Sequence, residues 1–179
     1  MATNRWRTVS TFPSGERPDC WSWLAEQGSL TERVRKLDSV EPFHLDVLYE
    51  ARERLNADDA QLLGFRAGDP AIIREVTLNR GSTPMIFARS VMPSCSTNGS
   101  NSWLARLGDR PLGDALFDEE DIERSEFEVV LLDEGCLLHN RILLTIGWPG
   151  NPIWARRSRV AINGQPILIN ECFLLIPTS

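Results

Sequence analysis

The sequence predicts an α+β domain in which helices pack on an antiparallel β-sheet. Three observations lead to this prediction. Apolar and polar residues alternate in several segments, tight turn sequences join some of these segments in pairs, and helical patterns lie near the start and in the middle of the chain. With 179 residues, 42% hydrophobic and 25% charged, the chain has the length and composition of one globular domain. We expect a flexible arm over residues 1–19 and a single domain over residues 20–179.

Two short helices are expected at the start of the domain. The first covers residues 21–27 and is ended by Gly28. The second follows Ser29, which forms a capping box with Glu32, and runs to about residue 36. Further short helices or helical turns are expected at residues 56–64, 103–107 and 111–117.

Strands are expected where apolar residues alternate with polar ones. These segments are residues 43–55, 71–79, 85–92, 127–132, 154–162 and 167–177. The turn at residues 80–84 and the Asn163-Gly164 pair indicate two hairpins. Residues 94–101 are expected to form a polar loop, and the acidic run at 118–123 a solvated loop or a helix start. Residues 133–152 show no clear pattern.

Charge and composition exclude several classes of protein. The chain has 19 basic and 25 acidic residues, a net charge of −6, which argues against binding to nucleic acid or to anionic membranes. No apolar run is long enough for a membrane span, and residues 1–15 lack a signal-peptide pattern, so we expect a cytoplasmic protein. The four cysteines and two histidines are scattered, which predicts reduced thiols and no metal site.

Three charged residues interrupt apolar strand faces. Arg74, Arg89 and Glu171 each alternate with hydrophobic neighbours on a predicted strand. A buried charge costs several kcal/mol unless it is paired or binds a charged ligand. An internal Arg–Glu ion pair, or a strand end that reaches water, would explain each residue separately. Together the three charges favour a pocket in which arginine binds a carboxylate and the glutamate contacts a hydroxyl group or transfers a proton.

The densest basic run, Arg156-Arg157-Ser158-Arg159, lies on another predicted strand. Alternation places Arg157 and Arg159 on one face, with Arg156 pointing away. A solvated edge strand explains this run, and steering of an anionic substrate is the alternative. We expect Arg156 to lie outside the pocket, so that its replacement affects ligand binding much less than replacement of Arg74.

Common catalytic signatures are absent from the chain, including G-x-S-x-G, the P-loop, G-x-G-x-x-G and H-E-x-x-H. The residues by themselves therefore indicate a small cytosolic α+β domain with a pocket for a small carboxylate.

Four blocks of residues, each a weak signal alone, carry a resemblance to a known family. They are Trp23-Leu24 with Ser29-Leu30-Thr31-Glu32-Arg33; Arg74-Glu75-Val76 with Ala88-Arg89-Ser90-Val91-Met92-Pro93; Leu107-Gly108 with Pro111-Leu112-Gly113 and Leu116-Phe117; and Trp154, Arg156-Arg157-Ser158-Arg159, Gly164, Pro166, Glu171 and Phe173-Leu174. In this order and spacing they make the chain resemble bacterial chorismate pyruvate-lyases, which form 4-hydroxybenzoate for ubiquinone synthesis.

The resemblance implies an antiparallel sheet with packed helices, an internal ligand site and a role for each of five residues. Arg74 binds the ring carboxylate of the ligand, helped by the backbone amides of Leu30 and Leu112. Glu171 meets the 4-hydroxyl group as a base or only as an orienting group. Arg89 faces the enolpyruvyl carboxylate. Position 30 holds leucine where methionine also occurs in the family, a change that a backbone contact tolerates.

The resemblance further implies a cytoplasmic, monomeric lyase with chorismate as substrate, 4-hydroxybenzoate and pyruvate as products, and no cofactor, metal, nucleic acid or membrane span. Between Phe117 and Arg156 we expect this chain to be longer than its relatives, with the extra residues within 130–152, as a surface elaboration or a changed cover over the site. Two alternatives are a small-carboxylate-sensing domain, similar to effector-binding domains of transcription regulators, and a lyase for a related chorismate-derived acid.

Overall fold

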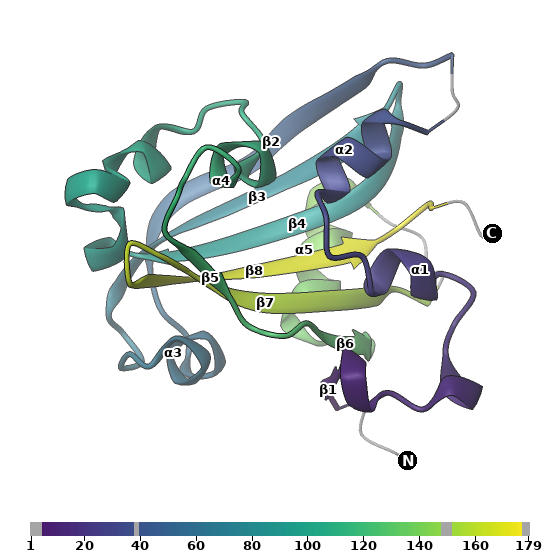
Figure 1. Cartoon of the computed structure of the whole chain (residues 1–179), viewed down its shortest axis with the longest axis horizontal. Helices are drawn as coiled ribbons and strands as arrows, with labels where there is room; N and C mark the ends of the chain where they lie inside the picture. The colour runs from purple at the N-terminus through teal and green to yellow at the C-terminus, as the bar shows by residue number, and fades with distance from the viewer. Residues whose placement is uncertain (1–4, 38–39, 148–151, 177–179) are drawn as a thin grey trace.

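A computed structural model of the chain describes residues 5–37, 40–147 and 152–176. Its centre is one antiparallel sheet with the strand order β1-β6-β7-β8-β4-β3-β2, and β5 pairs with β7 off this path. The strands are β1 (Arg7–Thr8), β2 (Phe43–Arg54), β3 (Pro70–Arg80), β4 (Thr83–Pro93), β5 (Ile122–Arg124), β6 (Glu128–Leu131), β7 (Trp154–Ile162) and β8 (Gln165–Phe173). The predicted α+β class with an antiparallel sheet is confirmed (Figure 1).

Five α-helices and four 3₁₀ helices are found within the described residues. The α-helices are α1 (Trp21–Leu24), α2 (Leu30–Arg35), α3 (Ala57–Leu63), α4 (Leu112–Leu116) and α5 (Leu137–Ile146). The 3₁₀ helices are η1 (Val9–Thr11), η2 (Ser14–Glu16), η3 (Ser94–Thr97) and η4 (Gly99–Arg106). The capping prediction for α2 is confirmed, because the Ser29 side chain accepts a hydrogen bond from the Glu32 amide.

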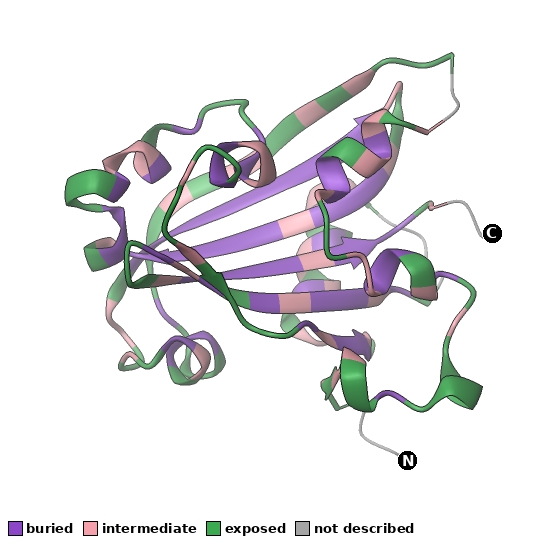
Figure 2. Cartoon of the chain, in the orientation of Figure 1, coloured by how far each residue is buried: buried purple, intermediate pink, exposed green. Residues whose placement is uncertain are grey.

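Helices cover both faces of the sheet. On the face toward the viewer in Figure 1 lie α1, α2, α4 and the segment that leads into β5, whereas α5 lies behind the sheet. Hydrophobic clusters fill both layers. The Leu24 side chain of α1 packs with Ile86 in front, and Ile142 of α5 packs with Phe87 behind. The central strands are therefore buried almost throughout, as Figure 2 shows.

Some segments differ from the sequence prediction. The polar loop expected at residues 94–101 forms all of η3 and the first three residues of η4, and part of the acidic run enters β5. The last strand ends at Phe173, and residue 177 of the predicted strand lies outside the described residues. The N-terminal segment predicted as a flexible arm packs on the domain, because β1 pairs with β6 and Phe12 is 5% exposed in the core.

The segment at residues 130–152, where extra residues are expected, contains α5. None of its described residues lines the large cavity on the front face, whereas several line a small cavity behind the sheet. This segment therefore elaborates the back of the domain and does not cover the front cavity. Within the described residues, no helix combines the length and apolar character needed for a bilayer span.

Candidate active site

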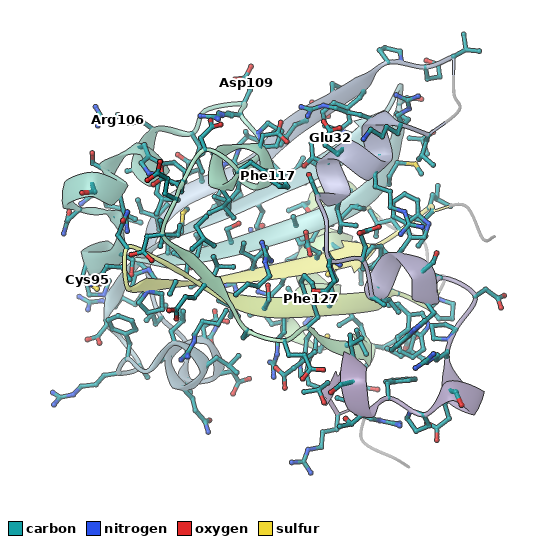
Figure 3. All side chains as sticks on the ribbon, in the orientation of Figure 1. Glu32, Cys95, Arg106, Asp109, Phe117 and Phe127 are labelled. Atoms are coloured by element: carbon teal, nitrogen blue, oxygen red, sulfur yellow. The ribbon has the colours of Figure 1, made fainter. Side chains whose placement is uncertain are left out.

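A cavity of about 380 Å³ lies between the front face of the sheet and the helices that cover it. Its floor is formed by β3, β4, β8 and β7, and its walls by the first turns of α2 and α4, the segment after α4, and β5. Phe117, which is 68% exposed, lines the mouth beside α4 and is labelled in Figure 3. The lining includes Leu30, Leu112, Arg74 and Glu171, four of the five residues expected to form a site.

The register of the strands explains which side chains meet on this floor. Arg74 pairs with Ser90, and Ser90 with Ile169, which in turn pairs with Ser158. A second row consists of Val76, Ala88, Glu171 and Arg156. Because cross-strand partners share a face, both rows point to the front. The small side chains of Ala88 and Ser90 lie in the middle and leave room above the sheet.

Arg74 lies at the β3 end of the first row, with its side chain 1% exposed. Its Nη2 donates to the carbonyl oxygens of Gly108 at 2.8 Å and Arg110 at 3.2 Å. Its Nε lies 3.2 Å from Glu50 Oε2 but lacks the alignment of a hydrogen bond, so this buried donor has no hydrogen-bond partner in the described protein. Burial lowers the pKa of Arg74, and Glu50 opposes the shift. A carboxylate in the cavity would satisfy the remaining donors.

Glu171 is paired with an arginine that sequence reasoning placed elsewhere. Arg156 Nε donates to Glu171 Oε2 at 2.6 Å, and Arg156 itself is 2% exposed and lines the cavity. The expectation that Arg156 lies outside the pocket is wrong, and so is the edge-strand interpretation, because β7 lies between β6 and β8.

The hairpin signal in the sequence could have revealed the contact between Arg156 and Glu171. The Asn163-Gly164 turn pairs Ile162 with Gln165, and counting six residues from each places Arg156 opposite Glu171.

The Arg156 guanidinium is held firmly by the protein. Nη1 donates to the carbonyl oxygen of Glu26 at 2.5 Å and lies 3.4 Å from those of Trp23 and Leu24, at the end of α1. The planar group also lies over the Phe127 ring, with 4.0 Å between Cζ and the ring centroid. One oxygen of Glu171 is therefore fixed by Arg156, and no protein partner is found for the other oxygen within the described residues.

Replacement of Arg156 by alanine is expected to lower the free energy of unfolding by about 2–3 kcal/mol, since it leaves Glu171 unpaired and buried carbonyl groups without a donor. Chemical denaturation of the variant measures this loss. Arg159→Ala is the matched control, because Arg159 is an exposed arginine on the same strand that lines neither cavity. Equal stability of the two variants would contradict a structural contribution from the Arg156–Glu171 pair.

Leu30 and Leu112 are the first residues of α2 and α4. The first amides of a helix have no partner inside the helix and attract anions. The two helix starts approach each other closely, since a Cβ atom built on Gly113 would lie 3.5 Å from Thr31 Oγ1. Both starts line the cavity that contains Arg74.

Arg89 does not join the other four residues. It pairs with Glu75 and lies behind the sheet, because Arg74 pairs with Ser90 and neighbouring residues of a strand face opposite sides. Arg89 Nη1 contacts Asp59 Oδ2 at 2.9 Å, and Nε lies 3.6 Å from Glu75 Oε1. Arg89 lines the separate cavity of about 150 Å³ on the back face. The expected contact of Arg89 with the ligand of the front cavity is therefore wrong for this structure.

Arg124 is a cavity residue that the sequence did not reveal. It lies on β5, next to the acidic run that dominated the sequence pattern. Its Nη1 donates to Ser158 Oγ at 2.8 Å, at the β7 end of the first row. The residue as a whole is exposed but lines the cavity, and burial of its guanidinium lowers the pKa of Arg124.

Comparison with solved structures shows the same fold at low sequence identity. The effector domain of PhnF from Mycobacterium smegmatis matches with a TM-score of 0.56 and 12% identity, covering 83% of this chain and 90% of that domain. The ligand-binding domain of a putative GntR-family transcriptional regulator from Bordetella bronchiseptica matches with a TM-score of 0.52 and 19% identity, covering 76% and 87%. At these identities the likeness shows the fold alone.

Sequence comparison identifies the family. A protein named probable chorismate pyruvate-lyase in Methylococcus capsulatus is 36% identical over 154 residues, covering 86% of this chain and 93% of its own length. A protein of the same name in Halorhodospira halophila is 37% identical over 171 residues, covering 94% and 88%. The family model described as chorismate lyase matches residues 5–178. This match includes every residue that lines the front cavity. The chain therefore belongs to the chorismate lyase family.

Proposed function

We propose that this chain is a chorismate pyruvate-lyase, which converts chorismate into 4-hydroxybenzoate and pyruvate. One observation carries the proposal: the same cavity is lined by Arg74, a buried arginine on β3 whose Nε has no hydrogen-bond partner in the described residues, and by Glu171 on β8, which has one oxygen without a protein partner there. Family membership and the relatives' names support the same reaction. The proposed setting is the cytoplasm, with the product serving ubiquinone synthesis.

Arg74 is the proposed anchor for the ring carboxylate, together with the amides of Leu30 and Leu112. A guanidinium binds a carboxylate through two parallel hydrogen bonds, and the helix starts add donors. Arg74 on β3 and Glu171 on β8 are separated by β4, so their backbones lie about 10 Å apart. That spacing is of the order of a benzene ring that carries a polar group at each para position. Apolar neighbours such as Val76 and Ile169 then contact the ring.

The reaction is an elimination that forms an aromatic ring. The C4–H bond breaks and its electron pair becomes part of the ring, while the C3–O bond breaks and the oxygen leaves with the enolpyruvyl group. The released enolpyruvate takes up a proton and becomes pyruvate. Aromatisation drives these steps, so the protein has to bind the dianion, orient it and assist the proton.

Glu171 is proposed to contact the 4-hydroxyl group and to accept the C4 proton. Arg156 holds Oε2 through Nε and leaves Oε1 for the ligand. Arg156 is therefore a positioning residue, whereas Glu171 touches the reacting atoms.

Turnover of chorismate without added metal is expected, and treatment with EDTA should leave the rate unchanged. The physical reason is that aromatisation supplies the driving force and arginines neutralise the carboxylates, so no Lewis acid is required. The measurement is the initial rate before and after chelation and dialysis. Loss of activity that a divalent ion restores would contradict this prediction.

The proposed function is tested by incubating the purified chain with chorismate and following 4-hydroxybenzoate by its absorbance and by chromatography. Formation of 4-hydroxybenzoate and pyruvate in equal amounts is the expected result. Tight binding of chorismate or 4-hydroxybenzoate with no conversion would instead identify a sensing domain. Conversion of chorismate into a different aromatic acid would identify a related lyase.

A further inference from the structure

The proposed substrate carries two carboxylates, and Arg74 accounts for only one of them. A second buried carboxylate would need a cation of its own, because burying an unpaired charge is costly. Arg89 cannot supply it, since Arg89 lies behind the sheet and is paired with Asp59. The second cation must therefore come from the front cavity itself.

Three arginines line the front cavity within the described residues: Arg74, Arg124 and Arg156. Arg156 already uses Nε on Glu171 and Nη1 on the carbonyl oxygens at the end of α1. Arg124 differs from both, because no carboxylate of the described chain lies within ion-pair distance of its guanidinium. Its hydrogen-bond partner is the neutral Ser158 hydroxyl, and the nearby Glu171 carboxylate favours its charged form without forming an ion pair with it.

The position of Arg124 suits a carboxylate at the far side of the ring. Ser158, which accepts from Arg124, is the β7 member of the row that begins with Arg74 on β3. The two guanidinium groups therefore approach the cavity from opposite edges of its floor. Arg124 Cζ also lies 5.3 Å from the centroid of the Phe127 ring, which fixes the guanidinium from one side. Phe127, labelled in Figure 3, lies between β5 and β6 in the chain.

We propose that Arg124, held by Ser158, forms the subsite that binds the carboxylate of the enolpyruvyl group. The proposal rests on the proposed function, because it assigns the second carboxylate of that same substrate. 4-Hydroxybenzoate lacks this carboxylate, so the subsite binds substrate and not the aromatic product. Arg124 thereby favours chorismate over 4-hydroxybenzoate in a cavity whose remaining contacts both molecules share.

Replacement of Arg124 by alanine tests the subsite. We expect KM for chorismate and its dissociation constant to rise about 10- to 100-fold, the scale for losing one charge-assisted contact. The dissociation constant of 4-hydroxybenzoate, measured by calorimetry, should change less than twofold. Arg124→Lys should recover part of the loss, since it restores the charge without the planar fork. Ser158→Ala should give a smaller rise in KM, because it removes the hydroxyl group that orients Arg124.

Arg159→Ala is the matched control, as an exposed arginine next to Ser158 that lines neither cavity, and it should behave as wild type. Wild-type KM in Arg124→Ala would overturn the subsite, and so would equal weakening of chorismate and 4-hydroxybenzoate. Unchanged 4-hydroxybenzoate binding also shows that the variant is folded. If the wild-type chain binds chorismate without converting it, the proposed function fails. The ratio of the dissociation constants of chorismate and 4-hydroxybenzoate, compared between wild type and Arg124→Ala, still decides whether Arg124 binds the second carboxylate.

Discussion

Replacement of Arg74 by alanine is expected to weaken 4-hydroxybenzoate binding by about 2–5 kcal/mol, the range for truncating one partner of a buried charge pair. The side chain is 1% exposed and lines the cavity, and its Nε has no hydrogen-bond partner in the described residues. Without the guanidinium, the ligand carboxylate would be buried with only the helix amides of Leu30 and Leu112 as donors. Calorimetric titration with 4-hydroxybenzoate measures the loss directly.

Arg74→Lys should recover little of this affinity. A single ammonium group cannot reproduce two parallel hydrogen bonds, and it would also leave the carbonyl oxygens of Gly108 and Arg110 without their present donor. Arg106→Ala is the control, because Arg106 is exposed, donates a hydrogen bond to Ser102 Oγ at 3.2 Å and lines neither cavity. Wild-type affinity in the lysine variant would show that Arg74 is not a bidentate anchor.

Replacement of Glu171 by glutamine should lower turnover of chorismate by two or more orders of magnitude if Glu171 accepts the C4 proton, the usual scale for loss of a general base. Glutamine keeps the shape and a hydrogen-bonding group but cannot take up the proton. Its amide also loses the charge that now pairs with Arg156. The measurement is kcat under saturating chorismate, with Glu123→Gln as an exposed control on β5 that lines neither cavity.

A purely orienting role for Glu171 makes a different prediction. Glutamine should then cost about tenfold in turnover, and benzoate, which lacks the hydroxyl group, should bind wild type and variant nearly alike. A folded Glu171→Ala protein with normal 4-hydroxybenzoate binding and wild-type turnover would exclude both roles. It would also show that the family role of this position does not apply to this chain.

Local signals in the sequence predicted many elements correctly. Asn56 caps α3 through a hydrogen bond from the Asp59 amide, and Gly64 ends the helix with a positive φ of 79°, as the sequence between them indicates. The Asn163-Gly164 turn pairs β7 with β8, and both of its residues have positive φ. Such features depend on residues close in sequence, so they can be recognised without the tertiary structure.

The segments predicted least well lack such local signals. β5 has three residues and pairs with β7, which begins thirty residues later. Its strand conformation therefore depends on a distant partner rather than on its own pattern. Arg124 belongs to β5, and for this reason its place in the cavity lining could not be predicted from the sequence pattern.

For this protein, the sequence by itself determined the fold class and most helix and strand positions. It also showed that charged residues lie on apolar strand faces, where each needs an oppositely charged partner or ligand. The tertiary structure alone decided which charges meet. Alternation assigns two faces to each strand, but it does not relate the faces of different strands until their register is known. The register places Arg74 and Glu171 in front and Arg89 behind, and it brings Arg156 to Glu171. The physical reason is that a shift of one residue moves a side chain to the other face of the sheet.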